Sequence, residues 1–163
     1  MFSPVHIPVG MFLATWIPGG PLPVLVAGVA SHLALDAIPH GDAGIGHWVH
    51  SSPNHATKLQ RLLPMVFIDQ ILGGGVFLLL LSSPRMASTG FWILLAGAFG
   101  SILPDYITGI RDLLPKPPGW LESLHRIHQK CHYSGKEPFT ILTGLIFQTI
   151  LVLLFLGYSF SPF

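Results

Sequence analysis

The sequence predicts an all-α, polytopic membrane protein that folds as a single helical domain over residues 1–163. Half of the residues are hydrophobic and only 9% are charged, whereas about a quarter of the residues are charged in a soluble domain. The mean hydropathy is +0.62. Long apolar segments recur along the whole chain, which is the pattern of several membrane helices.

About five apolar segments are expected to form the membrane helices. A helix needs about 20 apolar residues to cross a bilayer, and the first segment is short for that, so it tilts or forms a hairpin with the second. The second segment stops near Pro39 and the fourth near Pro104, as helices tend to near a proline. The segments are 4–17, 22–38, 62–81, 91–103 and 139–158.

A further helix is predicted at 119–132 and is amphipathic rather than apolar. Such a helix typically lies on a membrane surface. Its apolar stripe consists of Leu121, Leu124, Ile127 and Cys131, and its polar stripe of Glu122, His125, Gln129 and His132.

The basic residues predict the orientation in the membrane. We place the loop between the fourth and fifth segments on the same side of the membrane as the 39–61 loop. Seven of the eight lysines and arginines then lie on that side, and only Arg85 lies on the other. Because basic residues favour the cytoplasmic side, we expect a multi-pass protein of the cell inner membrane with a cytoplasmic N-terminus. A net charge of +1 without a basic run gives no reason to expect nucleic-acid binding.

The stretch 31–42 combines an apolar helix with polar chemistry. His32, Asp36 and His40 recur every four residues and therefore share one face of a helix. Ionisable residues in such an apolar segment are costly and are usually functional. A structural reading is also open for each residue alone, since His32 could be a hydrogen-bonded interior histidine and His40 could serve a helix C-terminus.

Groups from other helices are predicted to meet this face. His6 begins the first segment, Asp69 lies about two turns into the third, and Asp105 ends the fourth. Alone, Asp69 could pair with a buried arginine or cap a backbone break, and Asp105 could be a turn or N-cap residue. Together, imidazoles and carboxylates suit a divalent cation such as Zn²⁺ or Mn²⁺, as one ion or two.

Three blocks resemble a known family. The blocks 31–40, 100–105 and 125–126 are similar to those of the membrane-bound metal-dependent hydrolases of bacterial and archaeal inner membranes, and of a smaller group of relatives with an H-x-x-x-D-x-x-P-H block. Ile107 stands where the larger family often has a second acid. The altered run after the third block ends at Tyr133-Ser134. The resemblance implies the following metal ligands: His6, His32, Asp36, Asp105 and His125.

The leading hypothesis is a metal-dependent hydrolase that acts on a lipid or membrane-proximal ester or phosphoester. One of His125 or His128 would act as general acid or base, and Arg126 would hold an anionic group of the substrate. His32, Asp36 and Asp105 would hold the metal, with His6 and Asp69 completing or orienting it. The alternative is a non-enzymatic membrane protein with a structural metal or an acid–histidine cluster. The sequence leaves the substrate, the metal and the oligomeric state open.

Overall fold

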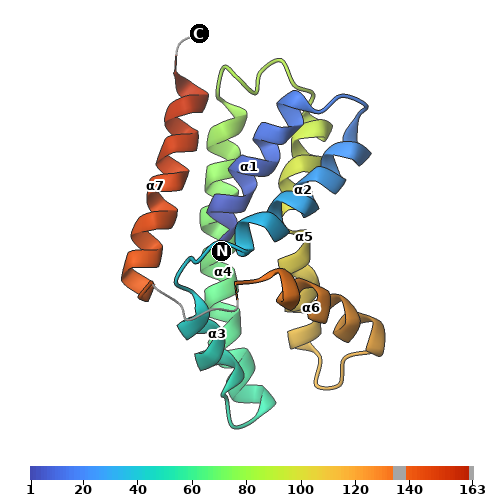
Figure 1. Ribbon diagram of the computed structural model, residues 1–163, viewed down its shortest axis with the longest axis vertical. Helices are drawn as coiled ribbons and strands as arrows, with labels where there is room; N and C mark the ends of the chain where they lie inside the picture. Colours follow the sequence, from blue (N-terminus) through green and yellow to red (C-terminus); the bar gives the residue numbers. More distant parts are fainter. Residues whose placement is uncertain (134–138, 162–163) are drawn as a thin grey trace.

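The computed structural model describes residues 1–133 and 139–161, and these residues form helices and loops without a strand (Figure 1). Ser134, and Lys136 among the seven basic residues counted above, lie outside the described residues. The helices are α1 (Ser3–Trp16), α2 (Pro21–Asp36), α3 (Ala43–His50), α4 (His55–Leu81), α5 (Phe91–Leu113), α6 (Gly119–Cys131) and α7 (Ile141–Phe160).

In the described part of the chain, three helices are long and apolar enough to cross a membrane, namely α4, α5 and α7. The prediction of about five such helices is therefore too high. The first two apolar segments form α1 and α2, which have 14 and 16 residues and reach only about 21–24 Å at 1.5 Å per residue. A turn with positive φ at Gly19 and Gly20 joins them as a hairpin.

Two helix boundaries differ from the prediction for local reasons. Helix α5 continues past Pro104 to Leu113, because a proline removes one hydrogen bond without ending a helix that is packed on its neighbours. The predicted 39–61 loop contains α3 and the start of α4. Asn54 caps α4 by accepting a hydrogen bond from the Thr57 backbone N–H at 2.9 Å.

Helices α1 and α2 cross α5 at very short range because glycines meet at both crossings. A Cβ atom added to Gly97 would lie 2.2 Å from the carbonyl oxygen of Gly10, and one added to Gly100 would lie 2.3 Å from that of Leu25. Small residues allow this close approach between membrane helices. The core beside the crossings is apolar and includes Met11, Val24, Leu80, Met86 and Leu94.

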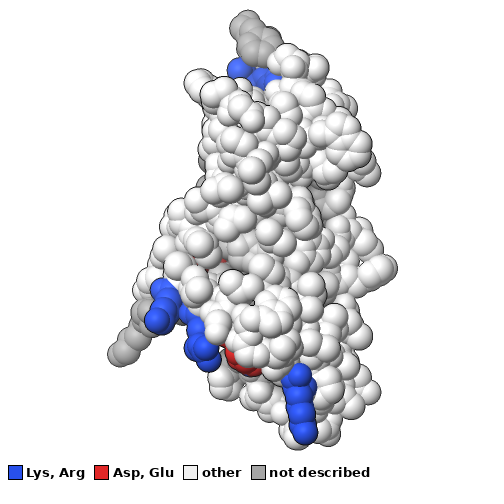
Figure 2. Space-filling model, turned by 90° about the vertical axis from the view of Figure 1, so that its right-hand side faces the viewer, with Lys and Arg blue, Asp and Glu red and all other residues white. Residues whose placement is uncertain are grey.

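The outer helices expose an apolar surface. Large hydrophobic side chains such as Phe67 and Leu78 on α4 and Leu142 and Leu153 on α7 are 60–67% exposed, as is typical of a lipid-facing surface. On the face seen in Figure 2, lysines and arginines lie toward the two ends of the molecule, and none is seen in the middle.

Helix α6 confirms the predicted amphipathic helix, although its buried face differs from the expected stripes. Leu121 and His128 are its buried residues, while Leu124 and Ile127 are 39% and 57% exposed. The helix therefore turns a histidine toward α2 and α5, and the middle of its apolar stripe faces away from the fold.

Gly97→Leu is expected to destabilise the fold because its side chain would collide with the backbone of α1. We expect a loss of at least about 1–3 kcal/mol, the usual cost of overpacking, seen as a lower midpoint of thermal unfolding in detergent. Gly74→Leu is the control, because a Cβ atom there meets nothing within 4 Å. Equal stability of both variants would contradict the close crossing.

Candidate metal centre

Three helices bring four metal-ligating side chains to one place. His32 and Asp36 lie in the last turns of α2, Asp105 lies on α5, and His128 lies near the end of α6. One ligand atom from each of the four lies within 4.8 Å of the others. The predicted meeting of His32, Asp36 and Asp105 is present, and His128 joins them.

Three of these atoms form a tight triangle. Nε2 of His32 lies 3.1 Å from Nε2 of His128 and 3.1 Å from Oδ2 of Asp36, and Nε2 of His128 lies 3.0 Å from the same oxygen. An ionised carboxylate has no hydrogen, and each Nε2 atom carries at most one. At most two hydrogens are therefore available for the three contacts of the triangle. One cation bound by all three atoms would instead compensate all three contacts.

The histidine rings are oriented by hydrogen bonds at their other nitrogen. Nδ1 of His32 donates to the carbonyl oxygen of Ser101 at 2.7 Å, which leaves Nε2 free to face the triangle. Nδ1 of His128 lies 3.1 Å from the hydroxyl oxygen of Thr108. Metal-binding histidines characteristically have such a partner, which fixes the ring and its tautomer.

Asp105 is the fourth member of the group, and it lies farther from the other ligand atoms, on the side that solvent reaches. Its Oδ1 atom lies 3.6 Å from Nε2 of His32 and 3.9 Å from Nε2 of His128. The Asp105 side chain is 40% exposed, whereas those of His32 and Asp36 are 0% and 1% exposed. A small molecule could therefore reach the group from the side of Asp105.

The spacing suits a small divalent cation. Ligand atoms 2.0–2.2 Å from a tetrahedral zinc ion lie about 3.3–3.6 Å apart, and the distances given above span 3.0–3.9 Å. Two imidazoles and two carboxylates are ligands that Zn²⁺ or Mn²⁺ accepts. The group could therefore hold a divalent metal ion.

His6 lies against this group without a hydrogen bond of its own. It is fully buried, its ring stacks on that of His32 with centroids 4.1 Å apart, and neither ring nitrogen has a hydrogen-bond partner. Its Nε2 atom lies 3.3 Å from Oδ1 of Asp36. The predicted proximity of His6 to the site is therefore present.

A second group shares Asp36. It consists of Asp36, His40 and His132, whose ligand atoms also lie within 4.8 Å of one another. Asp42 lies beside it. Burial alone would raise the pKa of Asp42, but the hydrogen bond from His40 and the nearby Met1 ammonium outweigh burial and lower that pKa to about 2. Burial lowers the pKa of His132, which favours the neutral, metal-binding form of its imidazole.

Three residues singled out from the sequence lie outside both groups. Asp69 accepts hydrogen bonds from the backbone N–H and the hydroxyl of Ser3, at the start of α1. This contact corresponds to the capping role left open for Asp69 in the sequence. Nδ1 of His125 lies 3.5 Å from the hydroxyl oxygen of Thr108. The Thr108 side chain thus lies between His125 and His128 and contacts both rings. Arg126 is exposed and donates to the Ser123 hydroxyl.

Asp42 is missed as a candidate ligand, and His132 is expected only as one of three histidines, with His125 and His128, of which at least one serves the site. A signal for His132 exists, because it follows His128 by four residues and so shares its face of α6. His40 was expected on the same helix face as Asp36. The helix instead ends at Asp36, and a short loop carries His40 back to the group.

Comparisons of the chain with protein-family models, with curated proteins and with solved structures give no match. The case for a metal centre therefore rests on the geometry of the side chains.

Thr108→Val is expected to weaken metal binding by about 10–100-fold, because it removes the hydrogen-bond partner of a ligating histidine. The measurement is a zinc titration in competition with a chromophoric chelator. Thr15→Val is the matched control, since the Thr15 hydroxyl bonds only within its own helix, to the carbonyl oxygen of Phe12. An unchanged zinc affinity for Thr108→Val would contradict the role of His128 as a ligand.

Proposed function

We propose that the chain is a membrane-embedded, divalent-metal-dependent hydrolase that cleaves an ester or phosphoester bond of a membrane lipid. The observation that carries this proposal is the triangle formed by His32, Asp36 and His128. Its three inward-facing atoms lie within 3.1 Å of one another.

The three residues of the triangle and the more distant Asp105 would have different roles. His32, Asp36 and His128 would hold the metal, since catalytic zinc sites have three protein ligands and one open position. A divalent ion bound there would lower the pKa of a water ligand and polarise the oxygen of the scissile group. Asp105, farther away and exposed, stands where a general base would accept the proton of the attacking water.

His125 is best placed for a supporting role in proton transfer. The Thr108 hydroxyl lies 3.5 Å from Nδ1 of His125 and 3.1 Å from Nδ1 of His128. A proton could pass along this chain of hydrogen bonds between the buried ring and the less buried one. Arg126 lies two residues before His128, hence on another face of α6, where its guanidinium can contact the anionic headgroups of lipids.

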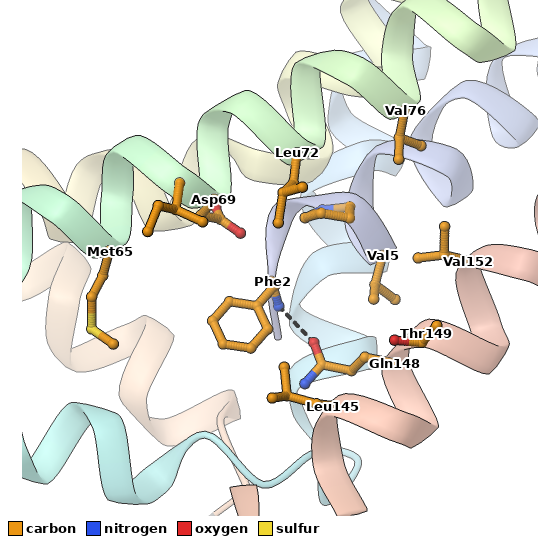
Figure 3. A pocket seen from close by; sticks show the side chains of 12 residues that line it. Phe2, Val5, Met65, Asp69, Leu72, Val76, Leu145, Gln148, Thr149 and Val152 are labelled. Carbon is orange, nitrogen blue, oxygen red and sulfur yellow. Dashed lines mark hydrogen bonds between the residues drawn. The ribbon is translucent and has the colours of Figure 1, made fainter. Parts of the chain in front are cut away.

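A groove supports a lipid as the substrate. It has a volume of about 410 Å³, within the range of ligand pockets, and its walls are α4 and α7, with the start of α1 between them (Figure 3). Its lining is mostly apolar, and α4 and α7 are both candidate membrane helices. An acyl chain can therefore enter from the bilayer.

The groove is also linked to the metal centre by hydrogen bonds. Gln148, which lines it, accepts a hydrogen bond from the Phe2 backbone N–H at 2.9 Å (Figure 3) and donates one to the carbonyl oxygen of His40 at 2.9 Å. Gln148 thus connects the wall of the groove to the loop that carries His40.

The orientation in the membrane is part of the proposal. Lys58 and Arg111 both contact Asp112 at 2.7 Å, where the start of α4 and the end of α5 lie beside α6. The basic residues toward this end favour the cytoplasmic side of the inner membrane. The metal centre would then face the inner leaflet, with the N-terminus on the cytoplasmic side.

One observation favours a structural role instead. Four protein ligands close a tetrahedral zinc site, and closed sites are typically structural. If Asp105 were the fourth ligand, its removal would release the metal and loosen the fold, whereas a general base can be replaced without loss of metal.

Asp105→Asn therefore separates the two roles. We expect it to keep its metal and its unfolding midpoint and to lose about 10²–10⁴-fold in kcat. The assay is mass spectrometry of products released from bacterial lipid extracts in mixed micelles with Zn²⁺ or Mn²⁺. His47→Ala, at an exposed residue outside both groups, should keep full activity. Loss of metal and fold in Asp105→Asn, or an inactive wild-type protein, would overturn the proposal.

Thr149→Trp tests the groove. Its indole would fill part of the space for an acyl chain, so KM for a long-chain lipid should rise about tenfold, the factor for roughly 1.4 kcal/mol of lost binding. A short-chain substrate analogue should be affected much less. The control is Ile150→Trp, at a neighbouring exposed residue that does not line the groove. Equal effects of both variants on both substrates would exclude the groove as the lipid site.

A further inference from the structure

The two oxygens of the Asp36 carboxylate face different neighbours. Oδ2 belongs to the triangle with His32 and His128. Oδ1 lies 3.3 Å from Nε2 of His6 and 2.6 Å from the α-amino nitrogen of Met1. One carboxylate thus serves two separate positions.

The second position is surrounded by further ligand atoms. Nδ1 of His40 donates to the carbonyl oxygen of Ile38 at 2.6 Å, so its Nε2 atom faces inward, 2.9 Å from Oδ1 of Asp42. Nε2 of His132 lies 3.9 Å from Oδ2 of Asp36, and the ring centroids of His132 and His40 are 4.8 Å apart. Two imidazoles and two carboxylates therefore meet here as well.

A positive charge already lies among these atoms. The Met1 amino nitrogen is 3.1 Å from Nε2 of His40 and 3.5 Å from Oδ2 of Asp42, in addition to its contact with Asp36. An ammonium group in contact with two carboxylates and an imidazole marks a position that favours a cation.

His6 gives a second, independent indication. It is fully buried, and both of its ring nitrogens lack a hydrogen-bond partner. Buried polar groups are rarely left unpaired. Its Nε2 atom approaches the Asp36 oxygen that faces the second position, so a cation bound there would give this nitrogen a partner.

We propose that the chain binds two divalent cations and that the Asp36 carboxylate bridges them. The first ion would be bound together with His32 and His128, and the second together with His40, Asp42 and His132. This inference rests on the proposed function for the first ion. The second ion would take the place that the Met1 amino group holds between Asp36, His40 and Asp42.

A second ion narrows the substrate class. Two-metal sites stabilise both the attacking and the leaving oxygen of an in-line displacement, and they are common in enzymes that cleave phosphoesters. Of the bonds considered above, a phosphoester of a membrane lipid then fits the centre best.

The test is the number of zinc ions per chain. The protein purified in detergent is stripped with a chelator, loaded with Zn²⁺, freed of excess metal and analysed by mass spectrometry of the elements. We expect about two ions for the wild type and for His47→Ala, and about one for His132→Gln and Asp42→Asn. His132 and Asp42 are 23% and 21% exposed, so these variants should fold, which thermal unfolding checks.

The outcomes separate this inference from the proposed function. One ion in the wild type, unchanged in His132→Gln and Asp42→Asn, would overturn the second site and leave the proposed function standing. No bound metal in the wild type would overturn both.

Manganese gives a spectroscopic readout that a merely structural change would not produce. Two Mn²⁺ ions bridged by one carboxylate should show a broadened, exchange-coupled electron paramagnetic resonance spectrum. His132→Gln should instead give the resolved hyperfine lines of an isolated Mn²⁺ ion. Isolated-ion lines in the fully loaded wild type would contradict the bridge.

Discussion

The whole centre depends on one buried carboxylate, that of Asp36. Its side chain is 1% exposed and lies within 3.3 Å of His6, His32, His128 and the amino group of Met1. Removing a carboxylate from water costs several kcal/mol unless opposite charge and hydrogen bonds compensate it. The histidines that gather around Asp36 are therefore best understood as a shell that pairs with this charge directly or through bound cations.

The glycine crossings explain how the fold brings that shell together. Gly28 of α2 lies one turn before His32, and Gly97 and Gly100 of α5 precede Ser101, whose carbonyl oxygen accepts the hydrogen bond from His32. Without the close approach of α2 and α5, Nδ1 of His32 would lose this partner. The same helices then position Asp105 and, through Thr108, His128. Packing and metal chemistry are thus linked through a few backbone contacts.

Composition and apolar periodicity were enough to predict helices that are long and apolar enough to cross a membrane, and the spacing of His32 and Asp36 was enough to predict that these two side chains lie together. The sequence could not show that α1 and α2 are short, because hydropathy does not reveal how two helices pair through a turn. The apolar stripe predicted for α6 is right only in part: Leu121 is buried, but so is His128, which follows no apolar pattern, whereas Leu124 and Ile127 are exposed. Asp69 is an acidic residue in an apolar segment, as expected of a site residue. Its contact with Ser3 depends on a helix that is distant in sequence.

The most direct test of the central claim is an anomalous diffraction map of zinc-loaded crystals, collected on both sides of the zinc absorption edge. The account predicts an anomalous peak within about 2.0–2.2 Å of Nε2 of His32, Nε2 of His128 and Oδ2 of Asp36. It also predicts that this peak disappears in Asp36→Asn. A map with zinc only at exposed histidines such as His47, and none between α2, α5 and α6, would contradict it.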